Sequence, residues 1–70
     1  MPKTIRELRD ANVLTQFELA GMVGVRPETI SLWERGERRP RPLHIRKLAE
    51  VFSVTPSDIE LIESEGKLAA

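Results

Sequence analysis

The sequence predicts an all-α fold, a compact bundle of five helices in one small domain. Start signals for helices recur along the 70 residues, and no stretch alternates apolar and polar residues for long enough to form a useful strand. A chain of this length buries only about 60% of its unfolded surface, so the core is modest. We expect one domain over residues 1–63 and a flexible C-terminal tail over residues 64–70.

Capping boxes mark the starts of the first two helices. Thr4 is followed three residues later by Glu7, and Thr15 by Glu18. In this pattern the hydroxyl accepts from the backbone N–H three residues on, and the carboxylate accepts from the N–H of the capping residue. We expect the second helix to end at Gly24, because a left-handed turn is inexpensive for glycine.

Proline and glycine positions divide the rest of the chain. Pro27 suits the first position of a third helix, which we expect to end at Gly36. Residues 37–42 indicate an extended basic loop, since proline disfavours the α region in the residue before it. A fourth helix is expected over about residues 43–52, and a fifth is expected to begin at Thr55–Asp58.

Charge is unevenly distributed although the net charge is zero, with 11 Lys and Arg against 11 Asp and Glu. Residues 26–47 carry a net charge of +4, and residues 48–70 carry −4. A basic segment favours an anionic partner. Taken alone, however, the charges are more typical of solvated helix surfaces, so other features must identify the partner.

The residue types that catalysis and metal binding need are scarce. The chain has no cysteine and one histidine, which excludes disulfides, zinc–thiolate sites and His-rich metal sites. It offers no nucleophile with a base and an orienting group, and no glycine-rich phosphate loop. No apolar run approaches the ~18 residues of a membrane span, and no signal peptide precedes the domain. We expect a cytoplasmic protein that is not an enzyme, needs no cofactor and does not bind membranes.

The second and third predicted helices form a helix-turn-helix pattern. The small side chain of Ala20 lets the two helices approach, and Gly24 takes the short turn between them. The outer face of the third helix is polar, and a helix held by its inner face can enter a DNA major groove with such a face. The apolar residues expected between the helices are Leu19, Val23, Val25, Ile30 and Trp33.

A series of spaced segments carries a specific combination of residues. These are Ile5–Arg9, Leu14–Ala20, Val23–Val25, Thr29–Gly36, Arg39–Pro40 and Leu48–Glu50. Together they resemble the lambda-repressor-like, or XRE-type, helix-turn-helix family over about residues 4–62. The resemblance implies a five-helix bundle that binds double-stranded DNA and usually controls transcription. On this basis we expect a sequence-specific regulator, a repressor, with its recognition helix over about residues 27–35.

The resemblance also implies contacts to the DNA backbone. Gln16 matches a family glutamine that hydrogen-bonds a phosphate at the start of the second helix, where the helix N-terminus also favours an anion. Arg41 matches an arginine near the minor groove, where arginine reads shape. The alternatives are a solvated glutamine and a solvated loop. The residues expected at phosphates are Thr15, Gln16, Arg38, Arg39 and Arg41.

The third helix is expected to supply the contacts to base edges and the groove. Arg26 can bind guanine or a phosphate, and Glu28 can accept from cytosine; the alternative is a local surface pair between them. Pro27 and Leu32 stand where members of the family often carry polar residues that read bases. Proline has no N–H donor and leucine is apolar, so this helix can make few hydrogen bonds to bases. The expected groove residues are Arg26, Pro27, Glu28, Thr29, Ser31 and Leu32.

Five further residues are expected to have roles other than reading bases. Arg9 and Glu34 match a family pair that bridges the first and third helices, which we interpret as a structural ion pair. Trp33 is expected as a core anchor. His44 is expected to be exposed or to lie on the phosphate side. Phe17 is expected to be partly exposed, where it either packs on the turn between the first two helices or serves a partner.

The expected partners are double-stranded DNA and a second copy of the chain. A monomer of this size makes few contacts, whereas a two-fold dimer reads half-sites about 34–36 Å apart. The dimer surface is expected on the fifth helix and its flanks, through Leu61, Ile62 and Leu68. The alternative is an antitoxin-type module that binds a partner protein, such as a toxin, through the acidic segment Glu60–Glu65 and also binds its own promoter.

Overall fold

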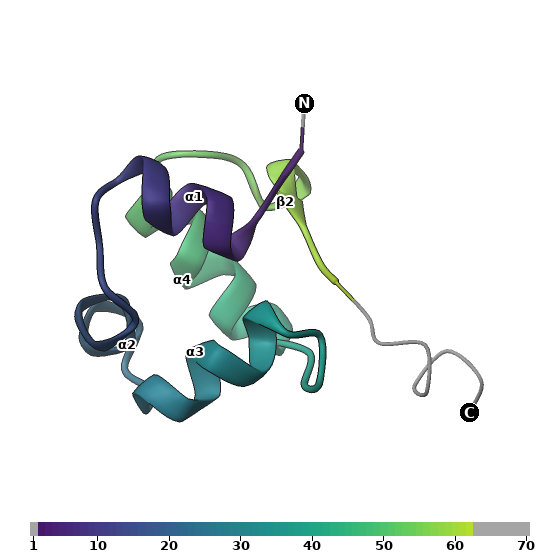
Figure 1. Cartoon of the computed structure of the whole chain (residues 1–70). Helices are drawn as coiled ribbons and strands as arrows, with labels where there is room; N and C mark the ends of the chain where they lie inside the picture. Colours follow the sequence, from purple (N-terminus) through teal and green to yellow (C-terminus); the bar gives the residue numbers. More distant parts are fainter. Residues whose placement is uncertain (1, 63–70) are drawn as a thin grey trace.

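The computed structural model describes residues 2–62, which form four α-helices, one turn of 3₁₀-helix and two very short strands (Figure 1). The predicted tail over residues 64–70 lies outside the described residues. None of the helices within residues 2–62 has the length and apolar character that crossing a bilayer requires. The elements are β1 (Lys3–Thr4), α1 (Ile5–Ala11), α2 (Gln16–Val23), α3 (Pro27–Glu34), α4 (Pro42–Phe52), η1 (Pro56–Asp58) and β2 (Ile59–Glu60).

The expected fifth helix is absent from residues 2–62, so the prediction of a five-helix bundle was wrong in its last element. Thr55 and Pro56 do start a helical turn, but it is 3₁₀ and ends at Asp58. Ile59 is extended, with φ −97° and ψ 117°. Its backbone lies opposite Lys3 in a parallel pairing of β1 with β2, and its side chain is buried. Strand pairing and burial therefore outweigh the helix-start signal.

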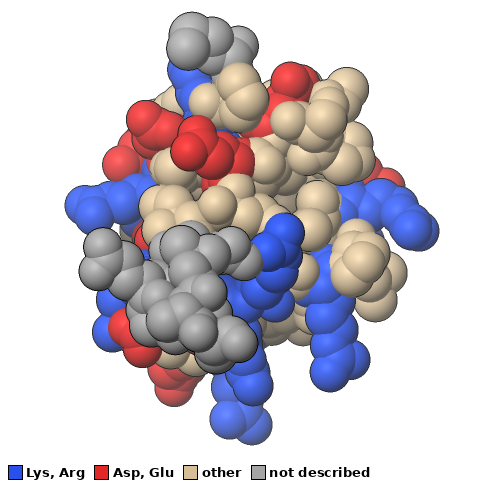
Figure 2. Space-filling model, turned by 90° about the vertical axis from the view of Figure 1, so that its right-hand side faces the viewer, with Lys and Arg blue, Asp and Glu red and all other residues tan. Residues whose placement is uncertain are grey.

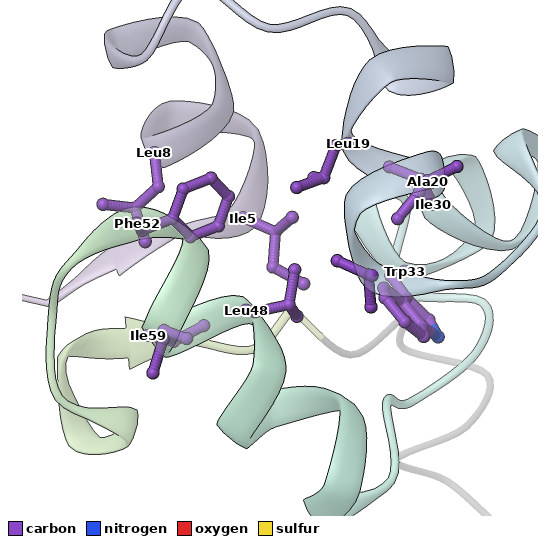
Figure 3. Packing of buried hydrophobic residues seen from close by; sticks show 11 residues of the cluster. Ile5, Leu8, Leu19, Ala20, Ile30, Trp33, Leu48, Phe52 and Ile59 are labelled. Carbon is purple, nitrogen blue, oxygen red and sulfur yellow. The ribbon is translucent and has the colours of Figure 1, made fainter.

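All four helices contribute side chains to one apolar core (Figure 3). Leu19, Ile30 and Leu48 have no exposed surface. Burying side chains of this size stabilises the fold by about 1.5–3 kcal/mol each. The buried apolar residues are Ile5, Leu8, Leu19, Ala20, Val23, Ile30, Trp33, Leu48, Ala49, Phe52 and Ile59.

The four helices end in the same way, each with a residue in the left-handed region. These residues are Val13, Gly24, Gly36 and Ser53, with φ of 54°, 85°, 75° and 57°. In each case the N–H of the next residue donates to the carbonyl five residues earlier, over 2.9–3.1 Å. This hydrogen bond satisfies a carbonyl that the end of the helix would leave unpaired. The sequence indicated this ending only at the two glycines.

Candidate nucleic-acid interface

Helices α2 and α3 form the predicted helix-turn-helix, joined by Gly24, Val25 and Arg26. The inner face of α3 is fixed in the core through Ile30, which is 0% exposed, and Trp33, which is 3% exposed. The N-terminal end of α3 and its outer face remain accessible to a partner.

A hollow of about 580 Å³ lies between the outer side of α3 and the loop that leads to α4, and we term it the basic groove. Figure 2 views the side of the molecule where this loop lies and shows several Lys and Arg side chains projecting from the lower half of that face. Among the residues that the structure describes, four arginines line the basic groove against one carboxylate, that of Glu28. The arginines are Arg26, Arg38, Arg39 and Arg41. The groove therefore suits an anionic partner.

Two predicted readers, Arg26 and Glu28, are exposed at the start of α3. No hydrogen bond or ion pair joins them in the described part of the chain. Their guanidinium and carboxylate groups are therefore available to a ligand.

The helices that border the basic groove begin differently from the other two. In α1 and α2 a threonine side chain caps the N-terminus with the reciprocal box that the sequence predicts. In α3 and α4 the capping positions are Arg26 and Arg41, and neither makes a side-chain cap. In α3 the N–H of Thr29 donates to the carbonyl of Arg26 over 2.9 Å, whereas the N–H of Glu28 is left for solvent or for an anion, beside the positive side chain of Arg26.

The two residues predicted at a phosphate on α2 make contacts within the protein. The hydroxyl of Thr15 accepts from the N–H of Glu18 over 3.0 Å, and the carboxylate of Glu18 accepts from the N–H of Thr15 over 2.9 Å. The side-chain amide of Gln16 donates from Nε2 to Oε1 of Glu34 over 3.0 Å. An amide nitrogen carries two protons, so Gln16 keeps one for another acceptor.

Arg9 and Glu34 lie together across α1 and α3. Nε of Arg9 donates to Oε2 of Glu34 over 2.6 Å, and Nη2 donates to Oε1 over 3.1 Å. Nη1 of Arg9 donates to the carbonyl of Leu14 over 2.9 Å. The hydrogen bond to Glu34 raises the pKa of Arg9 above its ordinary value, and the side chains are only 13% and 5% exposed. With Gln16, these contacts tie α1 and α2 to α3.

The remaining residues that were predicted to contact the DNA groove divide between the basic groove of the protein and the flank of α3. Thr29 and Leu32 line the groove and are half-buried. Pro27 occupies the first position of α3, as its fixed φ favours. The carbonyl of Ser31 accepts from Nε of Arg35 over 3.4 Å. Neither Pro27 nor Ser31 lines the groove, so both belong to the flank of α3.

Several residues expected to serve a partner lie elsewhere on the surface. Phe17 on α2 is 75% exposed, more than the sequence suggested. The predicted dimer surface lacks the helix on which it was placed: Leu61 is half-buried and Ile62 is 42% exposed in the extended segment after β2. Leu68 lies outside the described residues.

Several contacts could not be found from the sequence. No spacing rule links Gln16 to Glu34, 18 residues later, because their meeting depends on how α2 crosses α3. His44 was expected to be exposed or on the phosphate side, but its contact with Trp33 at the edge of the basic groove was not predicted. The signal that could have indicated this position is its place directly after the arginine-rich loop.

Comparison with known proteins identifies the family. A helix-turn-helix family model matches residues 5–59. Two HTH-type transcriptional regulators of Archaeoglobus fulgidus are each 40% identical over 65 residues, which is 93% of this chain and 93% and 92% of theirs. A Bacillus subtilis regulator of the same type is 47% identical over 51 residues, 71% of this chain and 37% of that protein. No solved structure gives a significant match.

A type II methyltransferase of Staphylococcus aureus also matches, at 33% identity over 61 residues. The match covers 87% of this chain but 14% of that enzyme, so it gives no ground for assigning methyltransferase activity here. The family model and the full-length relatives together show that the chain belongs to the XRE-type helix-turn-helix family of DNA-binding transcription regulators.

Proposed function

We propose that this protein is a sequence-specific repressor that binds double-stranded DNA as a homodimer, with α3 in the major groove. The observation that carries the proposal is the basic groove, in which four arginines lie beside the outer face of a helix whose inner face is buried. A rigidly held helix with a cationic rim suits the phosphate-lined edges of a major groove.

Base reading is assigned to the start of α3. The guanidinium of Arg26 can donate two hydrogen bonds to guanine, and the carboxylate of Glu28 can accept from the amino group of cytosine. Thr29 and Leu32 supply apolar contacts of the kind that thymine methyl groups make. Pro27 and Ser31, on the flank of α3 and outside the basic groove, border the major groove of the bound DNA.

Backbone binding is assigned to α2 and to the loop before α4. Gln16 and Thr15 lie at the N-terminus of α2, where phosphate is favoured. Arg38 and Arg39 face the backbone, and Arg41 enters the minor groove, which it reads by width. For a dimer with six to eight phosphate contacts, a plot of the logarithm of the binding constant against the logarithm of the salt concentration would have a slope of about −5 to −7. A bound dimer represses by covering its operator.

The test is selection of bound sequences from random duplex DNA by the purified protein at moderate salt. We expect an inverted repeat with half-sites about ten base pairs apart. Arg26→Ala and Glu28→Ala should change the selected sequence, whereas Gln16→Ala should weaken binding without changing it. Arg6→Ala is the matched control, because this exposed arginine of α1 does not line the basic groove. Absence of any enriched sequence would overturn the proposal.

A further inference from the structure

His44 occupies a specific place at the edge of the basic groove. It lies in the first turn of α4, is half-buried, and lines both the basic groove and a second hollow of about 310 Å³ beside α2. Its ring centroid is 5.3 Å from that of Trp33, with the ring planes at 44°. Because Trp33 is itself fixed in the core, this contact restricts the orientation of the imidazole.

The charged surroundings of His44 are almost entirely cationic. Among the described residues, no hydrogen bond engages either of its ring nitrogens. Within residues 2–62, Glu28 on α3 is the one carboxylate that lines the two hollows. The cationic groups facing the same two hollows are Arg26 on α3, Arg38, Arg39 and Arg41 in the loop, and Lys47 on α4.

A protonated imidazole among these cations needs an anion beside it. Histidine is the side chain that gains and loses charge near neutral pH, and its protonated ring has two N–H donors. The face of Trp33 also favours a neighbouring cation. If DNA occupies the basic groove, its phosphates supply such an anion. Proton uptake and DNA binding would then strengthen each other by the same factor.

We propose that His44 is a pH-dependent phosphate contact, so that the protein binds DNA more tightly as the pH falls from 8 to 6. The inference rests on the proposed function, because it requires DNA in the basic groove. A charge-assisted hydrogen bond at a partly exposed site should give a gain in affinity of about fivefold per protomer.

The first experiment compares DNA affinity at pH 6 and pH 8, at fixed salt, for the wild type and for His44→Asn and His44→Gln. The wild type should bind more tightly at pH 6, and both variants should lose most of this gain. Gln16→Ala is the control, because this proposed phosphate contact lines neither hollow, and it should lose affinity equally at both pH values. Equal pH dependence in the wild type and in folded variants would overturn the inference while leaving the proposed function intact.

The second experiment uses the fluorescence of Trp33, the one tryptophan of the chain, which also contains one histidine. A protonated imidazole in ring contact quenches indole, so the wild-type emission should fall as the pH is lowered, and His44→Gln should abolish this step. Adding duplex DNA should move the midpoint of the step to higher pH. If DNA binds but the pH midpoint of the fluorescence step does not move, the inference is contradicted. Failure to bind DNA at any pH instead contradicts the proposed function.

Discussion

A Cβ atom on Gly36 would lie 2.8 Å from the carbonyl oxygen of Ile62 and 2.9 Å from its Cγ2. The segment after β2 therefore passes directly over the end of α3. Gly36 also has φ of 75°, which L-residues with a side chain rarely adopt. The glycine is needed both for the turn that ends α3 and for the close passage of the chain above it.

Gly36→Ala should destabilise the domain by about 2–4 kcal/mol, since it combines the left-handed cost with a steric collision. Gly24→Ala is the matched control. Its φ is 85°, but a Cβ there would meet nothing within 4 Å, so its loss should be only about 1 kcal/mol. Urea unfolding followed by circular dichroism measures both. Equal losses would show that the contact with Ile62 is not the cause.

Glu34→Ala should destabilise the domain by about 3–5 kcal/mol, because it leaves the guanidinium of Arg9 without its buried partner. The side-chain amide of Gln16 loses an acceptor in the same variant. Glu28→Ala, on the exposed face of the same helix, should change stability by about 0.5 kcal/mol or less. Thermal unfolding compares the two variants, and similar melting temperatures would refute the structural role of Glu34.

Val13→Gly should stabilise the domain by about 0.5–1 kcal/mol. Val13 has φ of 54° and its side chain is 87% exposed, so the variant relieves backbone strain and loses little packing. Val13→Ala retains a Cβ in the left-handed region and should gain less. Chemical unfolding of both variants tests this, and a destabilised glycine variant would contradict it.

Asp58 should contribute to stability at neutral pH and lose that contribution in acid. Its carboxylate accepts from the hydroxyl of Thr55 over 2.8 Å and from the Thr55 N–H over 3.2 Å. These hydrogen bonds lower the pKa of Asp58 below its ordinary 3.8. A carboxyl group whose pKa is lower in the folded state than in the unfolded state stabilises the folded state at pH values above the unfolded pKa. This stabilisation is lost as the pH falls through the folded pKa.

Comparing the free energy of unfolding of the wild type with that of Asp58→Asn across pH 2–7 tests this direction of the pH dependence. The wild type should be more stable at pH 7, and the difference should shrink below about pH 4. Glu60→Gln is the control, because no hydrogen bond in the described residues engages that carboxyl. A difference for Asp58→Asn that grows in acid would contradict the expected direction.

Local chemistry made much of the fold predictable. The capping boxes at Thr4 and Thr15 and the glycine turn at Gly24 lie where their residue types predict them. Two features were not predictable in this way. Val13 adopts a left-handed backbone conformation, which its β-branched side chain disfavours. It does so because the hydrogen bonds at the end of α1 require this conformation. The pairing of Lys3 with Ile59 joins two-residue strands too short to show a periodicity.

The candidate site was predictable in composition but not in arrangement. The sequence placed Arg26, Glu28 and the loop arginines on one functional surface, and the structure shows that they line one hollow. The contact of His44 with Trp33 depends on the angle at which α4 leaves the loop. Such an angle is set by packing in the core rather than by any local motif.

The parallel pairing of β1 with β2 also has a mechanical consequence. The two strands lie near the two ends of the described chain and run in the same direction (Figure 1). Tension that pulls these ends apart would load their hydrogen bonds in shear, all together, rather than opening them one at a time as in a hairpin. The paired strands β1 and β2, and not the helices, are thus the element that first resists force applied along the chain.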